Sequence, residues 1–347
     1  MLCRKMKSLA LLLLLFATMP LLGADDPGIA QAIAQGVALH DAGKYDEAIA
    51  KYREALAADP GNVSATYELA YSLYAKGDYA QCTTLLQPLA DMPGVLQPAV
   101  LTSLGNCLDS GGHPDEAIAA YRKALAIQPD NPSFLFNLAI TLSGKGELDE
   151  TRELLKRNAT LRPNHASGRY LLAQTFDQQN FRAAALLEYL RFLAIEPSTP
   201  RAKEAAAHVV EILHRGVSSD GGKNINITVD PDSRKEEGDF GSWEMMISIT
   251  GGLRFTKESR KKSEFEKTRD EVSSALAVLL ETRSDLGTNY TTTQNIPFFV
   301  TLDEQKLLDA FAGDVLLPLD LKGGDAWAKK NAAALQQYRA FIAAQAR

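Results

Sequence analysis

Few side chains in this chain of 347 residues have a spacing that could support catalysis or metal binding. His208, Glu211 and His214 lie three residues apart in an expected helix, and both residue types are common zinc ligands. One such set supplies too few ligands by itself, so a solvated helix face is the favoured interpretation. The segment DGGKN (220–224) has a lysine after two glycines but lacks the outer glycine and the following Ser or Thr of a phosphate-binding loop.

The sequence also lacks a nucleophile elbow, a paired-cysteine motif and a two-histidine zinc motif. We therefore predict no catalysis, no bound metal and no cofactor. Acid and base carboxylates that are far apart in sequence leave no local pattern, so an enzyme with an unrecognised site in residues 217–347 stays open as an alternative.

Two of the three cysteines, Cys82 and Cys107, lie outside the N-terminal segment. An oxidising compartment would permit a disulfide between them if their Cα atoms came within about 7 Å. Cys82 occupies a small, buried place in the pattern described below. The favoured interpretation is therefore an inert core thiol.

Composition excludes several classes of protein. Apolar residues make up 46% and charged residues 23% of the chain, which is typical of globular proteins rather than disordered or polytopic membrane proteins. The net charge is −6, whereas a non-specific nucleic-acid binder is normally basic because it must replace phosphate counterions. We therefore expect no nucleic-acid partner.

The N-terminus has the three parts of a secretory signal peptide. Arg4, Lys5 and Lys7 precede an apolar stretch at 9–22, and small residues follow before the acidic Asp25. The stretch is short for a bilayer span, which needs about 20 apolar residues. We predict a signal peptide at residues 1–24 and a secreted or periplasmic chain without membrane insertion after cleavage. A retained signal anchor is the alternative, because Leu22 is a poor residue at its place before the expected cut.

The next half of the chain contains five repeats of about 34 residues, which begin at positions 29, 63, 98, 132 and 166. Small residues recur at the eighth place of each repeat, namely Gly36, Ala70, Gly105, Ala139 and Ala173. Four of the five repeats end near a proline, at Pro60, Pro129, Pro163 and Pro197. Apolar residues recur at steps of three and four, and glycine-containing turns interrupt each repeat midway, which predicts a helix hairpin in each repeat. A single hairpin cannot bury its apolar face, so the hairpins must stack.

These repeats resemble tetratricopeptide repeats. The segments GKYDEAIAKYREALAADPGN (43–62) and GHPDEAIAAYRKALAIQPDN (112–131) are near-ideal examples, and the resemblance covers residues 29–199. It implies an all-α fold: a right-handed α-solenoid of five helix hairpins. A helix from Pro200 to Gly216 is expected to cap the solenoid, which gives a repeat domain at residues 29–216.

The resemblance also implies that the first helix of each repeat lines a concave groove. By that correspondence the expected partner-binding residues are Tyr67, Tyr71, Tyr74, Asn106, Phe136, Asn137, Tyr170 and Gln174. Aromatic anchors with interspersed amides suit an extended or helical peptide. Packing of the tyrosines against neighbouring helices is the alternative.

Members of the family that clamp a C-terminal carboxylate use two asparagines together with cations. Asn106 and Asn137 match the asparagine places, but the cation places hold Thr102, Ser167 and Leu171. The resemblance therefore does not imply a carboxylate clamp.

The C-terminal part is less regular. Residues 217–242 are rich in Gly, Ser and charge, which indicates a linker or long loop, and alternation at 225–229 indicates a short strand within it. We expect residues 243–347 to form a mainly helical region that resembles no family. Thr301 with Glu304 forms a predicted capping box for a helix through Phe311, and a last helix is expected from Asp325.

Taken together, these patterns predict an exported repeat scaffold that binds a partner protein or peptide in its groove without catalysis. Besides the enzyme alternative, an oligomerising structural component with paired C-terminal helices stays open.

Overall fold

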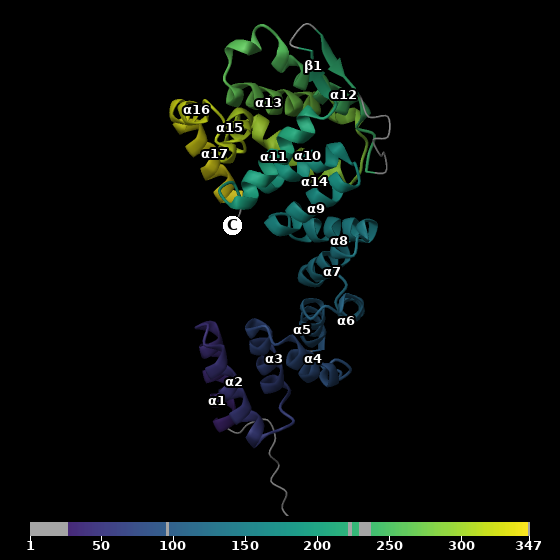
Figure 1. Ribbon diagram of the computed structural model, residues 1–347, viewed down its shortest axis with the longest axis vertical. Coiled ribbons are helices and arrows are strands. Elements are labelled where there is room, and N and C mark those ends of the chain that lie inside the picture. Colours follow the sequence, from purple (N-terminus) through teal and green to yellow (C-terminus); the bar gives the residue numbers. More distant parts are fainter. Residues whose placement is uncertain (1–26, 95–96, 221–223, 229–236, 346–347) are drawn as a thin grey trace, which may run out of the picture. The chain divides into compact units, whose positions relative to one another are not determined.

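The computed structural model describes residues 27–94, 97–220, 224–228 and 237–345. The expected signal peptide (1–24), and the lysine of the DGGKN segment, lie outside these residues. The chain forms two compact units, Met1–Gly112 and His113–Arg347, which we call the N-terminal and C-terminal units. The described part is almost entirely helical (Figure 1), as predicted.

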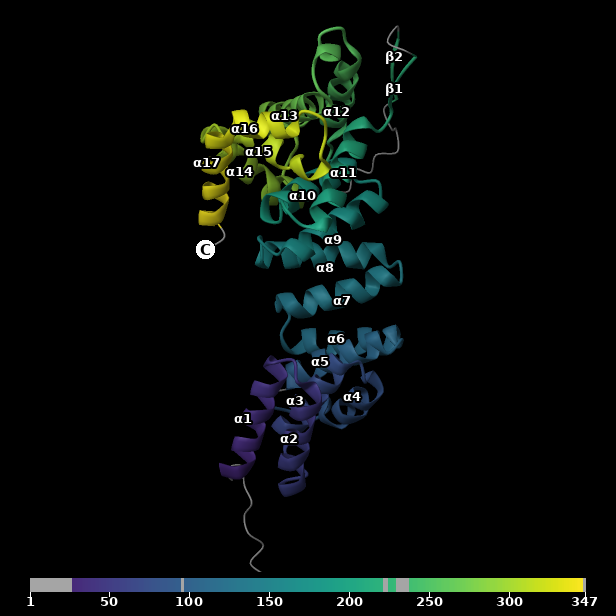
Figure 2. The same ribbon diagram turned by 60° about the vertical axis from the view of Figure 1, so that its left-hand side comes forward.

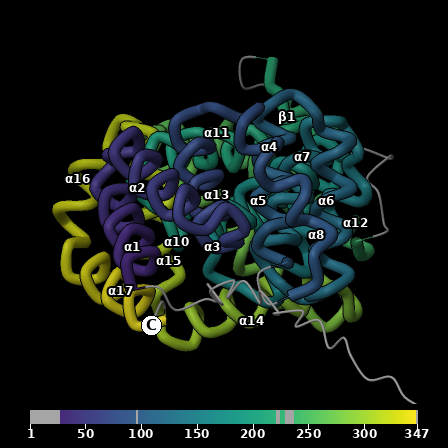
Figure 3. The backbone as a smooth tube through the Cα atoms, turned by 90° about the horizontal axis from the view of Figure 1, so that it is seen from below, coloured from purple at the N-terminus to yellow at the C-terminus, as the bar shows by residue number. Residues whose placement is uncertain are grey.

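In its described residues, 27–94 and 97–112, the N-terminal unit is helical. Its helices are α1 (Pro27–Asp41), α2 (Tyr45–Ala58), α3 (Val63–Lys76), α4 (Tyr79–Leu86) and α5 (Gln97–Ser110). Helices α1 and α2 lie side by side as a hairpin (Figure 3), and α3 packs on both α2 and α4. Gly36 on α1 lies against the ring of Tyr52 on α2, where a Cβ atom would overlap the ring. The small residue at the eighth place of this repeat therefore permits the close approach of the two helices.

The C-terminal unit contains the remaining repeats and the whole C-terminal region. Its repeat helices are α6 (Pro114–Ile127), α7 (Pro132–Gly144), α8 (Leu148–Leu161), α9 (Ala166–Gln178) and α10 (Arg182–Ile195). They are followed by α11 (Pro200–His214), α12 (Gly241–Gly252), α13 (Glu264–Thr282), α14 (Tyr290–Glu304), α15 (Leu308–Asp314), α16 (Gly324–Lys330) and α17 (Ala332–Gln345).

The turn and end signals of the repeats have direct structural causes. Gly43, Gly77, Gly112 and Gly146 adopt positive φ angles of 73° to 87° at the turns within the repeats, a conformation that glycine reaches without a steric penalty. Asn180 takes this place in the fifth repeat, with φ of 61°. The second helices α2, α6, α8 and α10 each end two residues before the predicted terminal proline.

Helix α10 is the centre of the C-terminal unit (Figures 1 and 2). Thirteen of its fourteen residues are buried, because α9 and α11 pack on it and α12 and α14 cover its other sides. Helix α11 is likewise covered, by α12 and α13. The helix expected as a cap thus lies inside a larger helical assembly.

Residues 217–242 contain a short β-hairpin. Strands β1 (Val217–Ser219) and β2 (Ile225–Ile227) pair in antiparallel register, with Ser218 opposite Asn226, and both lie against α12. The expected short β segment is therefore present.

The predicted capping box at Thr301 is wrong. Thr301 lies inside α14, and Glu304 is the last residue of that helix. The next helix begins only at Leu308. The cap of α14 is Asn289, whose side chain accepts a hydrogen bond from the backbone N–H of Thr292 at 2.9 Å. The chain leaves the helix at Lys306, where φ is 58°.

Candidate functional site

The first helices of the N-terminal unit present a row of aromatic rings. His40 on α1 stacks on Tyr71 of α3, with ring centroids 4.8 Å apart, and Tyr71 stacks in turn on Tyr67 at 6.5 Å. The side chain of Tyr71 is 45% exposed, whereas Tyr67 is half-buried. We call His40, Tyr67 and Tyr71 the aromatic row. It offers apolar area from rings that are already held in place.

Hydroxyl groups position the rings of this row and its neighbour Tyr74. The Nδ1 atom of His40 lies 2.8 Å from the Ser72 hydroxyl, and the Ser103 hydroxyl of α5 donates to the Tyr67 hydroxyl at 3.3 Å. The Ser110 hydroxyl is 3.4 Å from the Tyr74 hydroxyl, and the Tyr74 ring packs on Tyr79. Three consecutive first helices, α1, α3 and α5, are thereby linked across this surface.

Burial shifts the pKa values of two ionisable groups close to the aromatic row, Tyr52 and Glu68. Burial, and to a lesser degree the charge of Glu68, raises the pKa of Tyr52 to about 12. Burial also raises the pKa of Glu68 itself, although the nearby His40 acts in the opposite direction. Both shifts follow from the close packing of α2 against the helices that carry the row.

Asn106, the other expected residue of this unit, is half-buried on α5 and takes part in polar contacts of its own. Its neighbour Cys107 forms a disulfide with Cys82 of α4, with the two Cα atoms 6.1 Å apart. The expected inert thiol is therefore wrong. The stacking of consecutive repeats brings a second helix and the following first helix within disulfide distance, which the sequence alone does not reveal.

In the C-terminal unit, the expected residues of α7 and α9 differ in exposure. Phe136 and Asn137 of α7 are half-buried, and the Phe136 ring meets His165 edge-on at 4.6 Å. Gln174 on α9 is half-buried. Tyr170, in contrast, is 9% exposed and packs on Phe192 with ring centroids 4.9 Å apart.

The hydroxyl of Tyr170 donates to Glu204 of α11 at 2.9 Å. Burial, followed by this hydrogen bond, raises the pKa of Tyr170 to about 12. Tyr170 therefore joins α9 to α10 and α11 and is enclosed rather than available to a partner.

A buried ion pair joins α9, α10 and the C-terminal helices. Arg169 and Glu188 are both 0% exposed, and Nη1 of Arg169 lies 2.6 Å from Oε2 of Glu188. Oε1 of Glu188 accepts hydrogen bonds from Asn295 at 2.9 Å and from the Tyr290 hydroxyl at 3.2 Å, both of α14. Arg169 lies two residues from the expected clamp places at Ser167 and Leu171, but it is enclosed by this network.

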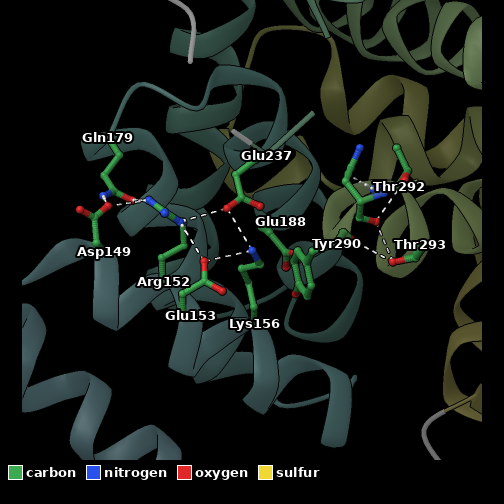
Figure 4. Close-up of polar contacts among 11 residues, drawn as sticks. Asp149, Arg152, Glu153, Lys156, Gln179, Glu188, Glu237, Tyr290, Thr292 and Thr293 are labelled. Atoms are coloured by element: carbon green, nitrogen blue, oxygen red, sulfur yellow. Dashed lines mark hydrogen bonds and ion pairs between the residues drawn. The ribbon is translucent and has the colours of Figure 1, made fainter. Parts of the chain in front are cut away.

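A second polar network anchors the segment before α12 to α8 (Figure 4). Glu237 is 5% exposed and lies 3.0 Å from both Nε of Arg152 and Nζ of Lys156. Arg152 also donates to Gln179 at 2.7 Å, which extends the network to the end of α9. The C-terminal region is thus fixed to the last two repeats by charged contacts as well as by apolar packing.

A polar cavity of about 310 Å³ lies where α12, α13 and the intervening turns meet. Glu271 in its wall pairs with His214 at 2.8 Å, and Asp270 pairs with Lys262 at 2.6 Å. Hydrogen bonding to Lys267 lowers the pKa of the neighbouring Glu264. Charged side chains of the C-terminal region do converge here and pair with one another, although Oε1 of Glu271 has no hydrogen-bond partner among the described residues.

His208 and His214, the two histidines of the candidate metal-binding set, contact different residues. His208 stacks on Tyr189 at 5.0 Å and lies 3.6 Å from Asp177, whereas His214 contacts Glu271. Across the part of the chain that the structure describes, no group of three or more His, Cys, Asp or Glu side chains could hold a metal ion. Likewise, none of the helices in that part has the length and apolarity needed to span a bilayer.

Comparison with known proteins agrees with the repeat architecture. Residues 39–92 match a family model described as tetratricopeptide repeat, and residues 105–146 match a model described as TPR repeat. The cellulose synthase operon protein C of Pseudomonas fluorescens (strain SBW25) is 30% identical over 156 residues, which cover 43% of this chain and 12% of that protein. The match thus spans about an eighth of the relative's length.

Three solved structures are similar at low identity. MamA is 20% identical, covering 46% of this chain and 94% of that chain, with a TM-score of 0.43. YrrB, described as a TPR protein with an unusual peptide-binding site, is 21% identical, with coverages of 51% and 89% and a TM-score of 0.42. A thermophilic TPR protein of Thermus thermophilus is 18% identical, with coverages of 53% and 98% and a TM-score of 0.42. At these TM-scores the similarity carries no argument about function.

Proposed function

Because residues 39–92 and 105–146 match tetratricopeptide-repeat models, we propose that this chain is a repeat scaffold that binds a partner protein or peptide through the aromatic row of its N-terminal unit, without catalysis. The observation that carries the proposal is the exposure of Tyr71, a residue that is 45% exposed although its ring is stacked between His40 and Tyr67. A large exposed ring that is already ordered gains apolar contact on binding and loses little entropy.

Tyr74 and Asn106 extend this surface along α3 and α5, and the hydroxyls of Ser103 and Ser110 add hydrogen-bonding groups. Rings flanked by hydroxyls and an amide suit a peptide that inserts an apolar side chain and satisfies its backbone at the edges. In the C-terminal unit, Phe136, Asn137 and Gln174 are the corresponding candidates, because each of them is half-buried rather than enclosed.

We also propose that the protein acts outside the cytoplasm. The disulfide between Cys82 and Cys107 supports this proposal, because structural disulfides persist in oxidising compartments. The charged start, apolar stretch and small-residue exit of residues 1–24 supply an export route. Sequencing of the mature N-terminus tests it, and a chain that retains residue 1 in the cytoplasmic fraction would contradict it.

The binding proposal is tested with Tyr71→Ala in the full chain. Partners are captured from the native compartment with the unmodified chain, and the affinity of each is then measured by calorimetry for both chains. Loss of a central ring at an interface costs about 2 kcal/mol, so we expect affinity to fall roughly 30-fold. The matched control is Ile127→Ala, because Ile127 is 46% exposed and lies on α6, a second helix that carries no residue of the row.

The free energy of unfolding separates binding from folding. An exposed ring contributes little to stability, so Tyr71→Ala should change it by less than about 1 kcal/mol. The proposal fails if Tyr71→Ala binds the partner as tightly as Ile127→Ala does. It also fails if Tyr71→Ala lowers stability by several kcal/mol, since the ring would then be part of the core.

A further inference from the structure

A cavity of about 430 Å³ lies within the C-terminal unit, among α10, α14 and α17. Most of the area of its wall is apolar, and the apolar lining includes Ala194 and Ile195 of α10, Phe298 of α14 and Ile342 of α17. A volume of this size falls in the range of small-molecule sites, which are typically apolar with a few polar groups that orient the ligand. No residue of the aromatic row lines it.

Two arginines line this cavity, Arg191 of α10 and Arg339 of α17, and Arg339 is paired with Asp314. Arg191 is 8% exposed, and its guanidinium carbon lies 4.0 Å from the centroid of the Phe298 ring. Its Nε atom is enclosed and has no hydrogen-bond partner among the described residues. Burial, and then the neighbouring Arg169, lowers the pKa of Arg191 to about 9, so the side chain is still cationic at pH 7.

The neighbouring charges are already committed to other partners. Glu188 pairs with Arg169 at 2.6 Å, and Asp314 at the cavity wall pairs with Arg339 at 2.6 Å. Arg191 is therefore a buried cation without a counter-ion among the described residues. A buried charge of this kind is costly unless it is paired, and a guanidinium pairs best with a planar anion that accepts two parallel hydrogen bonds.

A second enclosed polar atom lies beside this cation. The hydroxyl of Tyr338, which lines the cavity and is 1% exposed, has no hydrogen-bond partner among the described residues. A single carboxylate can accept from the guanidinium of Arg191 and leave lone pairs for such a hydroxyl.

We propose that this cavity binds a small organic monocarboxylate, with its carboxylate on Arg191 and its apolar body against Phe298 and Ile342. One unpaired cation matches one negative charge, which disfavours dianions. The apolar part of the wall disfavours inorganic anions, because apolar surface offers no donors in return for their lost hydration. The ligand is thus an aliphatic or aryl-alkyl acid whose body replaces water along the apolar wall.

The test measures binding to the full chain by calorimetry, with octanoate, 3-phenylpropanoate and indole-3-acetate as probes. Their primary amides and inorganic phosphate serve as comparisons, since the amides keep the shape and remove the charge. We expect at least one carboxylate to bind at least tenfold more tightly than its amide and than phosphate. Equal binding of acid and amide, equal binding of phosphate, or no binding of any acid would overturn the proposal.

Two variants connect the binding to the cavity. Arg191→Met should weaken the best carboxylate at least tenfold, whereas the melting temperature of the ligand-free chain should stay the same or rise, because an unpaired buried charge is replaced by an apolar side chain of similar length. Ile342→Trp should weaken the same ligand by filling the cavity while Arg191 stays in place. The matched control is Arg157→Met on α8, because Arg157 is half exposed and pairs with Asp130 on the surface.

These variants distinguish a ligand site from a structural arginine. Unchanged affinity in Arg191→Met, or a large fall in its ligand-free melting temperature, overturns the proposal. If Arg191→Met does not fold, the arginine is structural and the proposal is equally lost. Loss of binding in the control Arg157→Met would show that the probes bind by general charge attraction, which also contradicts it.

Discussion

The ion pair between Arg169 and Glu188 should be the most sensitive polar contact in the C-terminal unit. Both side chains are 0% exposed, and Glu188 is held by Arg169, Asn295 and Tyr290. The substitution Glu188→Gln keeps the shape of the side chain and removes its charge. Arg169 then remains buried without a counter-ion, close to the unpaired Arg191.

The size of the effect follows from the burial. Removing one partner of a fully buried pair costs about 3–5 kcal/mol, because the remaining charge stays desolvated. For a unit of this size, each kcal/mol corresponds to roughly 2–4 °C in melting temperature, so we expect a fall of roughly 6–20 °C. Arg169→Met should cost a similar amount, since Glu188 is then the uncompensated charge.

The fluorescence of tryptophan reports this unit selectively. The chain has two tryptophans, Trp243 and Trp327, and both are buried in the C-terminal unit. Urea unfolding followed by their emission therefore measures the stability of the unit that contains the pair. The N-terminal unit, without tryptophan, does not contribute to the signal.

A double-mutant cycle distinguishes the pair from its surroundings. The variant that carries both Glu188→Gln and Arg169→Met contains neither buried charge of the pair, so it should lose about 2–3 kcal/mol less than the two single losses added together. Additive losses would refute the reasoning, as would a loss below about 1 kcal/mol for Glu188→Gln. Adding Arg191→Met to Glu188→Gln should also recover stability, because it removes a second cation from the same region.

Three further predictions concern other parts of the chain. Cys107→Ser should destabilise the N-terminal unit by about 3 kcal/mol in urea unfolding followed by circular dichroism, because the disulfide closes a loop of 25 residues; a reductant should lower the stability of the native chain but not that of the variant. Gly313→Ala should cost about 1–3 kcal/mol by tryptophan emission, since the added Cβ would overlap the indole of Trp327, and an unchanged midpoint would contradict this packing. The pKa of Tyr52 is raised to about 12, so the stability that its protonated form contributes is present below pH 10 and is lost as the pH rises from 10 to 12. We expect the free energy of unfolding to fall by about 2 kcal/mol between about pH 9 and about pH 11.5, and this fall should be smaller in Tyr52→Phe.

Repetition is the reason why the first half of the fold could be predicted from sequence. A turn glycine that recurs at Gly43, Gly77 and Gly146 reports the same positive φ angle each time, so every repeat confirms the others. The terminal prolines mark helix ends by local sterics alone. Even the fifth repeat, where Asn180 replaces the glycine, follows the rule because asparagine tolerates that conformation.

Local patterns without repetition were less reliable. Thr301 and Glu304 have the spacing of a capping box, but the same residues are equally acceptable in the last turns of a helix. Asn289 forms the actual cap with Thr292, and that pair has the same local form. Only the packing of α14 on α10 determines which of the two begins the helix, and such tertiary contacts are not visible in a short window.

The candidate site could be predicted in part for the same reason. Repeat geometry distinguishes first helices from second helices, and Tyr71, which lies on a first helix, is exposed. Tyr170 occupies an equivalent place, yet α10 and α11 enclose it, because the array ends there and is covered. The disulfide of Cys82 also needed the distance between neighbouring repeats, which depends on how the helices stack.

The sequence of helix α10 contains a signal for the C-terminal cavity. In a repeat at the open end of an array, one face of the second helix meets solvent and carries most of its charges. In α10 the run LLEYLRFLAI is apolar on every side, and Glu188 and Arg191 are its only charges. A helix that is apolar all round must be covered all round, so the end of the array needs further helices from the same chain or another. The two charges in that run then have to find partners inside the protein: Glu188 has Arg169, and Arg191 faces the cavity, which is the physical reason to look for a ligand there.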